Sequence, residues 1–175
     1  MIGIVAGVAA AGIAAVLGLA ARKPDEFRVR RTARIAAPPD RIFPLINDFH
    51  AWAQWSPWEP LDPAMARTHS GAPSGPGAVY EWNGNKKVGE GRMEITDAAA
   101  PRRVAIDLDF IRPFASSNVT EFTLEPDGDG TTVTWDMRGP NAFVSKVMGV
   151  FVNMDRLIGK DFENGLASMK AVAEQ

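Results

Sequence analysis

The sequence predicts an α+β domain in which one curved antiparallel sheet wraps around a long C-terminal helix. Two patterns carry this prediction. From Phe27 onward, apolar and charged residues alternate in short runs separated by turn residues, as in strands with one buried face. From Phe143 to Met169, apolar residues recur at steps of three and four, which is typical of an amphipathic helix of about nine turns.

The composition is that of a globular protein with one core. The chain has 175 residues, of which 46% are hydrophobic and 23% charged, and its formal net charge is −2. It contains no cysteine, which excludes disulfide scaffolds, thiolate metal sites and cysteine nucleophiles. The small negative net charge argues against a nucleic-acid partner.

The first 21 residues form a separate apolar segment without a polar side chain. As a helix they would be roughly 30 Å long, the thickness of a bilayer core. We therefore expect a single-pass membrane anchor at 1–21; a cleaved signal peptide and a buried helix are the alternatives. Six of the eight charged residues in 1–36 are basic, and all follow the apolar run, which predicts a body on the cytoplasmic side.

The remaining elements follow from turn signals and periodicity. Residues 22–26 are expected to be a basic linker, and residues 27–175 one domain. Pro38-Pro39-Asp40 ends the first strand and begins a short helix. The expected strands are 27–35, 66–69, 78–82, 86–96, 104–110, 119–125 and 133–138, with helices at 41–47 and from 143 onward.

A curved sheet around a single helix predicts an internal cavity, because one helix face cannot fill the space. We expect it to open near the tryptophan-rich stretch 49–63 and to bind an apolar molecule. The predicted ligand-binding residues share the inward positions of the strands, the tryptophan-rich stretch and the last helix: Trp55, Trp58, Tyr80, Trp82, Met93, Ile106, Leu108, Phe110, Phe122, Trp135, Met137, Phe151, Met154 and Ile158.

Several motifs together resemble a known family. They are Ile35-Ala-Ala-Pro-Pro-Asp-Arg-Ile-Phe43, Trp55-Ser-Pro-Trp-Glu59, Val88-Gly-Glu-Gly-Arg-Met93, Gly130-Thr-Thr-Val-Thr-Trp135, and the helix from Met154 to Leu166. This pattern resembles the START-like (SRPBCC) superfamily, in its polyketide cyclase/dehydrase-type branch with an N-terminal membrane anchor. The resemblance implies the helix-grip fold, but not one chemistry, since the superfamily includes lipid carriers, hormone-binding proteins, cyclases and chaperone-activating domains.

No catalytic constellation emerges from the residues. The candidates for an acid or base are Tyr80, which shares the inward parity of Trp82, and Glu90, which lies in the family-like Val88-Gly-Glu-Gly segment. The strand carboxylates, Glu90 included, have the outward parity. The two histidines, His50 and His69, lack the spacing of a metal site, so we expect no metal and no cofactor.

These observations lead to one favoured function and two alternatives. The favoured function is a membrane-anchored binding or transport domain for an apolar or amphipathic small molecule, lipid or polyketide-like. The alternatives are a polyketide cyclase or aromatase, and a protein-interaction module of the same fold. The sequence does not indicate an oligomeric state.

Overall fold

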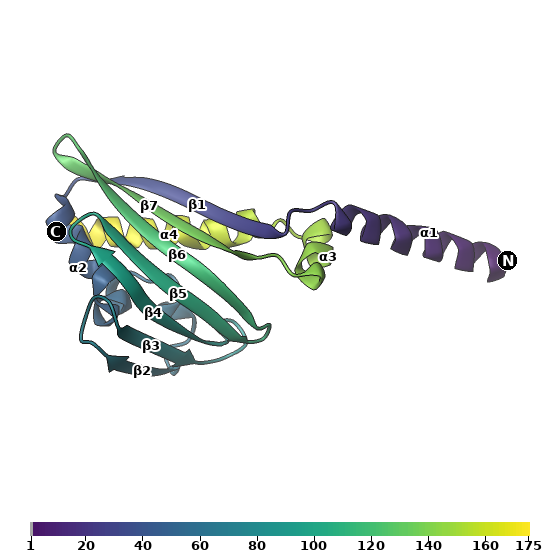
Figure 1. The fold of residues 1–175 in the computed structure, drawn as a ribbon, viewed down its shortest axis with the longest axis horizontal. Helices are drawn as coiled ribbons and strands as arrows, with labels where there is room; N and C mark the ends of the chain where they lie inside the picture. Colours follow the sequence, from purple (N-terminus) through teal and green to yellow (C-terminus); the bar gives the residue numbers. More distant parts are fainter. Residues whose placement is uncertain (1) are drawn as a thin grey trace.

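The computed structural model describes residues 2–175, while the side chains of residues 2–10 and of Met154 lie outside its description. Seven antiparallel strands form one curved sheet in the order β1-β7-β6-β5-β4-β3-β2 (Figure 1). The strands are β1 (Glu26–Ile35), β2 (Ala66–Gly71), β3 (Ala78–Asn83), β4 (Glu90–Ala99), β5 (Arg103–Arg112), β6 (Ser116–Asp127) and β7 (Gly130–Pro140).

Helices cover one face of the sheet. The long helix α4 (Met154–Ala173) crosses behind the strands (Figure 1). Between β1 and β2 the chain forms α2 (Pro39–Asn47) and two 3-10 turns, η1 (Phe49–Gln54) and η2 (Glu59–Leu61). The predicted α+β class, with an antiparallel sheet around a C-terminal helix, is confirmed.

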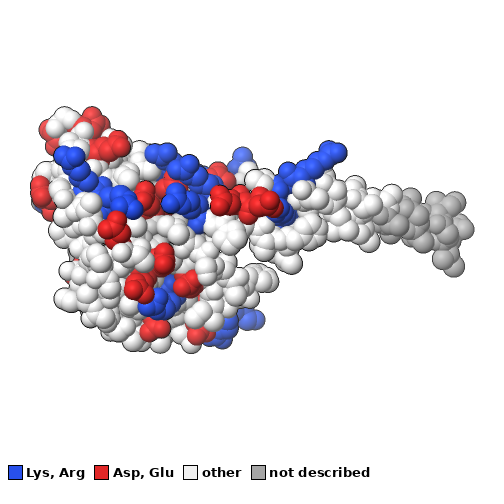
Figure 2. All heavy atoms as spheres, viewed as in Figure 1, with Lys and Arg blue, Asp and Glu red and all other residues white. Residues whose placement is uncertain are grey.

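The sheet has an apolar inner face and a charged outer face, because successive side chains of a strand point to opposite sides. On the inner face Phe122 of β6 pairs with Trp135 of β7. On the outer face the Arg28 guanidinium donates to Asp136, with Nε 3.0 Å from Oδ1. Figure 2 shows basic and acidic side chains interleaved over the sheet. The predicted alternation of the strands is therefore confirmed.

Aromatic rings hold α4 against the sheet. Trp135 stacks on Phe162 of α4 with ring centroids 4.0 Å apart. Beyond Phe162, Leu166 and Met169 of α4 are completely or almost completely buried, as is Ile46 of α2. This half of the interior is a packed core.

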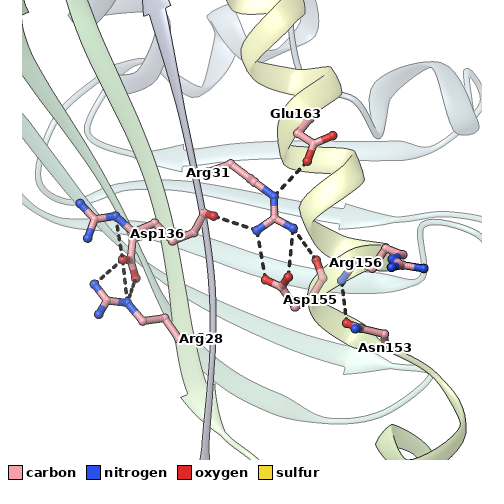
Figure 3. A network of polar contacts seen from close by, with 8 residues as sticks. Arg28, Arg31, Asp136, Asn153, Asp155, Arg156 and Glu163 are labelled. Atoms are coloured by element: carbon pink, nitrogen blue, oxygen red, sulfur yellow. Dashed lines mark hydrogen bonds and ion pairs between the residues drawn. The ribbon is translucent and has the colours of Figure 1, made fainter.

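Figure 3 shows how the first turns of α4 are held to β1. The Arg31 guanidinium donates to both carboxylate oxygens of Asp155, at 3.0 and 3.1 Å. Its Nε donates to Glu163, two turns later on the same side of α4, at 3.1 Å. One arginine thus joins two carboxylates of the helix and fixes its position along the strand.

The predicted nine-turn helix is wrong, because the chain forms two helices. The segment α3 (Phe143–Phe151) ends at Val152, whose backbone is extended (φ −122°, ψ 129°). The side chain of Asn153 then accepts a hydrogen bond of 2.9 Å from the backbone N–H of Arg156 and caps α4. A β-branched residue followed by a capping asparagine interrupts the helix although the apolar spacing continues across the break.

The N-terminal segment forms α1 (Ile2–Ala21), which extends beyond the end of the sheet where α3 lies (Figure 1). The end of α1 packs against α3, and Ala20 is fully buried. Among the residues whose side chains the structure describes, 11–153 and 155–175, no helix is both long and apolar enough to cross a bilayer. The predicted localisation, a single-pass membrane protein with a cytoplasmic body, is therefore wrong, and the predicted membrane contact of residues 1–21 loses its basis.

Candidate ligand cavity

The interior is hollow beside the packed core. A cavity of about 980 Å³ lies between the inner face of the sheet, α3 and the first turns of α4. Binding sites for small molecules typically measure about 300–1,000 Å³, so this cavity is large enough for a lipid-sized ligand. It exists because α4 contributes Ile158 and Phe162 to this region, and α3 turns away at Val152 instead of continuing across the sheet.

Most of the predicted ligand-binding residues border this cavity. Those that line it are Trp58, Tyr80, Trp82, Met93, Leu108, Phe110, Trp135, Met137, Phe151 and Ile158. Trp55, Ile106 and Phe122 are not among its lining residues and belong to the packed core. Met154 lies outside the described side chains. Inward parity therefore selects the correct face, but it does not distinguish the hollow half of that face from the filled half.

The mouth of the cavity lies at α3 and the β5–β6 turn. Here Phe114 and Phe151 line the cavity and are 64% and 72% exposed. The sequence predicted an opening at the tryptophan-rich stretch, but Trp52 and Trp55 are buried and their indole N–H groups donate to the backbone carbonyls of Ile46 and Leu45. Trp55 is confined to the core, whereas Trp52 and Trp58 contact the core and also line the cavity.

A polar cluster forms part of the cavity wall. The hydroxyl of Tyr80 donates to Glu59 Oε1 at 2.9 Å, and Arg67 Nε donates to Glu59 Oε2 at 2.7 Å. The Glu59 side chain is only 15% exposed. Burial, followed by the hydrogen bond to Glu59, raises the pKa of Tyr80. Tyr80 is thus a protonated hydrogen-bond donor at neutral pH.

A second carboxyl group in the wall is Asp161 of α4. Burial raises its pKa above the ordinary value for an aspartate. Asp155, six residues earlier on α4, also lines the cavity but is held by Arg31. The α4 side of the cavity therefore carries one carboxylate with an arginine partner and one whose charge is disfavoured by burial.

The sheet also places polar side chains inside the cavity, which the sequence analysis missed. Asn118 and Thr120 of β6 have the same inward parity as Phe122, and both line the cavity. Asn118 Oδ1, Thr120 Oγ1 and Trp135 Nε1 are buried without a hydrogen-bond partner within the described chain. The signal was available in the sequence: two polar residues occupy inward positions in an otherwise apolar alternation.

The two candidate catalytic residues lie apart. Tyr80 lines the cavity, but Glu90 does not and accepts a hydrogen bond from Arg112, a largely exposed side chain. No acid–base pair of Tyr80 and Glu90 exists. The carboxylate that hydrogen-bonds to Tyr80 is Glu59. Sequence reasoning did not select Glu59, because the two residues are 21 positions apart, in a 3-10 turn and a strand.

The two histidines meet outside the main cavity. The rings of His50 and His69 stack with centroids 4.2 Å apart, and His50 Nδ1 lies 2.8 Å from Asp48 Oδ1. Burial and the neighbouring His50 lower the pKa of His69. Among the described residues, no group of three or more histidine, aspartate or glutamate side chains is arranged to hold a metal ion.

Comparison with known proteins gives the same fold. Protein CV1439 from Chromobacterium violaceum is 16% identical over 87% of this chain and 99% of its own, with a TM-score of 0.60. Protein MLL2253 from Mesorhizobium loti is 13% identical over 83% of this chain and 96% of its own, with a TM-score of 0.62. DynU16, a protein in the dynemicin biosynthetic locus, is 18% identical over 87% of this chain and 48% of its own, with a TM-score of 0.59. No curated protein matches the chain.

At these identities the structural likeness shows the fold and not the function. The likeness agrees with the helix-grip fold expected from the sequence. The sequence comparison is more specific, because residues 26–174 match a single family over nearly the whole chain. The chain belongs to the family described as "Polyketide cyclase / dehydrase and lipid transport".

Proposed function

We propose that this chain binds an apolar or amphipathic small molecule, lipid or polyketide-like, in the cavity between the sheet and α4. The observation that carries the proposal is the cavity itself: about 980 Å³, lined mainly by aromatic and aliphatic side chains and open at one end. Burying apolar ligand surface there stabilises the complex by about 25 cal/mol per Å². The family description, with its cyclase, dehydrase and lipid transport members, is consistent with such a ligand.

The arrangement of the cavity favours binding and release over permanent enclosure. Its mouth is bordered by α3, a separate short helix, and by the exposed Phe114 of the β5–β6 turn. Its far end is closed by the stacked rings of Trp135 and Phe162. A ligand would therefore enter with its leading end toward Trp135 and leave by the same path.

Native mass spectrometry of the full chain after incubation with extracted lipids tests the proposal. We expect a bound species a few hundred daltons heavier than the free chain. In the variant Leu108→Trp the larger ring fills part of the cavity, and the bound species is lost. The matched control is Asp107→Trp, one residue away on the exposed outer face. Equal ligand occupancy in both variants, with circular dichroism showing that both are folded, would contradict the proposal.

A cyclase or dehydratase activity is the second candidate, favoured by the Tyr80–Glu59 hydrogen bond in the cavity wall. A buried, protonated phenol can donate a proton or hydrogen bond to a ligand carbonyl. If this activity exists, Tyr80→Phe abolishes turnover of a bound polyketide but retains its binding. Glu90→Gln, at a residue outside the cavity, serves as the control and retains turnover.

A further inference from the structure

The short helix α3 borders the cavity mouth but is itself barely buried. Among its apolar side chains, Phe143 is 52% exposed and Val144 is 63% exposed. Of its nine residues, all of which the structure describes, Lys146 is the one that is buried. A surface helix is normally held by an apolar stripe that faces the core. Since α3 lacks such a stripe, other contacts must fix its position.

The main packing partner of α3 is α1 and not the sheet. The two helices contact each other at the end of the sheet where β1 begins (Figure 1), and within the described chain no strand contacts α3 to a comparable extent. The residues that flank α3, Ala142 and Val152, are non-helical, with ψ angles of 150° and 129°. The helix is therefore a separate unit, whose position relative to the sheet depends on α1 and on the chain that follows α1.

The linker between α1 and β1, residues 22–25, holds the N-terminal end of α3. The Lys146 ammonium, in the first turn of α3, donates to the carboxylate of Asp25. Just before α3, Asn141 Nδ2 donates to the carbonyl of Pro24 at 3.0 Å, and the backbone N–H of Asn141 donates to the carbonyl of Asp25 at 2.7 Å. These contacts leave the other end of α3, which borders the mouth at Phe151, without an attachment of this kind.

The ion pair between Lys146 and Asp25 is asymmetric. The Lys146 side chain is only 9% exposed, whereas that of Asp25 is 98% exposed. The hydrogen bond and the charge of Lys146 lower the pKa of Asp25, which is therefore ionised at neutral pH. A buried ammonium without a counter-charge is unfavourable. Loss of the Asp25 carboxylate should therefore favour positions of α3 in which Lys146 reaches water.

We infer that α3 is a gate at the cavity mouth and that the ion pair between Lys146 and Asp25 holds this gate closed. The inference rests on the proposed function and adds a control of ligand passage. The second half of α3, from Met148 to Phe151, lines the cavity, so a rotation of the helix about its flanking residues widens the mouth. Because a ligand enters and leaves by the same path, opening of the gate limits both rates and leaves the affinity unchanged.

Stopped-flow fluorescence of the full chain with the probe 1-pyrenemethanol tests the inference. Asp25→Ala removes the carboxylate but retains the backbone carbonyl that accepts from Asn141. We expect association and dissociation of the probe both to become about fivefold faster, because Lys146 loses its counter-charge in the closed position. The dissociation constant should change by less than about twofold. Asp25→Glu, which retains a carboxylate, should behave like the unaltered chain.

The matched control is Asp129→Ala in the turn between β6 and β7. Asp129 is likewise a largely exposed aspartate, 2.6 Å from the Arg34 guanidinium, and its turn lies at the end of the sheet away from α3 (Figure 1). The rates of the probe should not respond to its loss. Unchanged rates in Asp25→Ala, or an equal acceleration in Asp129→Ala, would overturn the inference and leave the proposed function intact.

Hydrogen exchange without ligand gives an independent check. A helix of nine residues is marginal in water once it loses its neighbours. The backbone amides of α3 should therefore exchange about fivefold faster in Asp25→Ala, whereas those of α4 around Phe162 should keep their rates.

Unchanged exchange in α3 would show that the ion pair does not hold the helix, and would overturn the inference. Faster exchange in α3 with unchanged rates of the probe would show that the ligand does not pass α3, and would overturn it as well. Failure of the unaltered chain to bind the probe would instead contradict the proposed function, and the gate with it.

Discussion

The indole of Trp135 lies flat against the ring of Phe162, with planes 6° apart and centroids separated by 4.0 Å. This stack joins β7 to α4 at the boundary between the packed core and the cavity. It depends on close approach of the helix, because a Cβ at Gly165 would lie 2.8 Å from Trp135 Cζ3 and 3.0 Å from Pro57 Cδ. Neither neighbour is a flexible side-chain end.

Gly165→Ala should therefore destabilise the protein, although alanine favours a helix. The gain in helix propensity is about 1 kcal/mol, while overpacking costs about 1–3 kcal/mol, so we expect a net loss of about 1 kcal/mol. Urea unfolding measures it. The control Gly149→Ala in α3, where the nearest atom is 3.5 Å away, should stabilise the chain. A more stable Gly165→Ala variant would contradict the close approach.

Tyr80→Phe should lower the free energy of unfolding by about 1.5 kcal/mol, because the variant loses the hydrogen bond that the Tyr80 hydroxyl donates to the charged, largely buried Glu59. The effect should disappear in the background of Glu59→Ala, which removes the acceptor, if the two side chains act as a pair; a double-mutant cycle of urea midpoints measures this. Additive effects would mean that the hydroxyl acts elsewhere.

The His50–His69 stack predicts a loss of stability in mild acid. The pKa of His69 is lowered by burial and by His50, so the unfolded chain takes up a proton at this site more readily than the folded chain. Stability contributed by neutral His69 is complete above about pH 6.5 and declines as the pH falls through the unfolded value. Asp48 and Glu59, which face the pair, favour its charged form and reduce this decline.

Urea unfolding of the unaltered chain and of His69→Gln at pH 7.5 and 5.5 checks this prediction. The variant should lose less stability between the two pH values, because glutamine does not titrate. Identical losses in the two proteins would show that His69 has an ordinary pKa in the folded chain.

Asp161→Asn should stabilise the protein at pH 7, because burial raises the pKa of Asp161 and its ionised form is therefore unfavourable in the folded state. The gain should vanish at a pH below the ordinary aspartate value, where the carboxyl is protonated in both states. Thermal midpoints at pH 7 and pH 3 measure it. Asp155→Asn, which weakens the contact with Arg31, should have the opposite sign at pH 7.

Much of the fold could be predicted because strands repeat every two residues. The alternation in β5, β6 and β7 identified the inner face correctly, since one face of each strand must be apolar to contact α4. The break between α3 and α4 was missed because the apolar spacing from Phe143 to Met169 continues through it. Asn153 was the local signal, as a capping residue directly after the β-branched Val152.

The site was harder to predict than the fold, because periodicity shows which side chains of a strand point inward but not how far the sheet lies from the helix that covers it. Ile106 and Leu108 have the same parity on β5, but only Leu108 lines the cavity, since α4 covers the other half of the sheet. The Glu59–Tyr80 contact depends on the path of η2 over the sheet, which no repeat in the sequence specifies. Thr120 was visible as a polar residue at an inward position.

Methyl NMR of the seven methionines tests the central claim, that the cavity holds an apolar ligand, most directly. Met93 and Met137 line the cavity, whereas Met169 is fully buried in the packed core. Titration with 1-pyrenemethanol should shift the methyl signals of Met93 and Met137 through the ring current of the probe and leave that of Met169 in place. Unchanged signals from Met93 and Met137 at saturating probe would contradict the account.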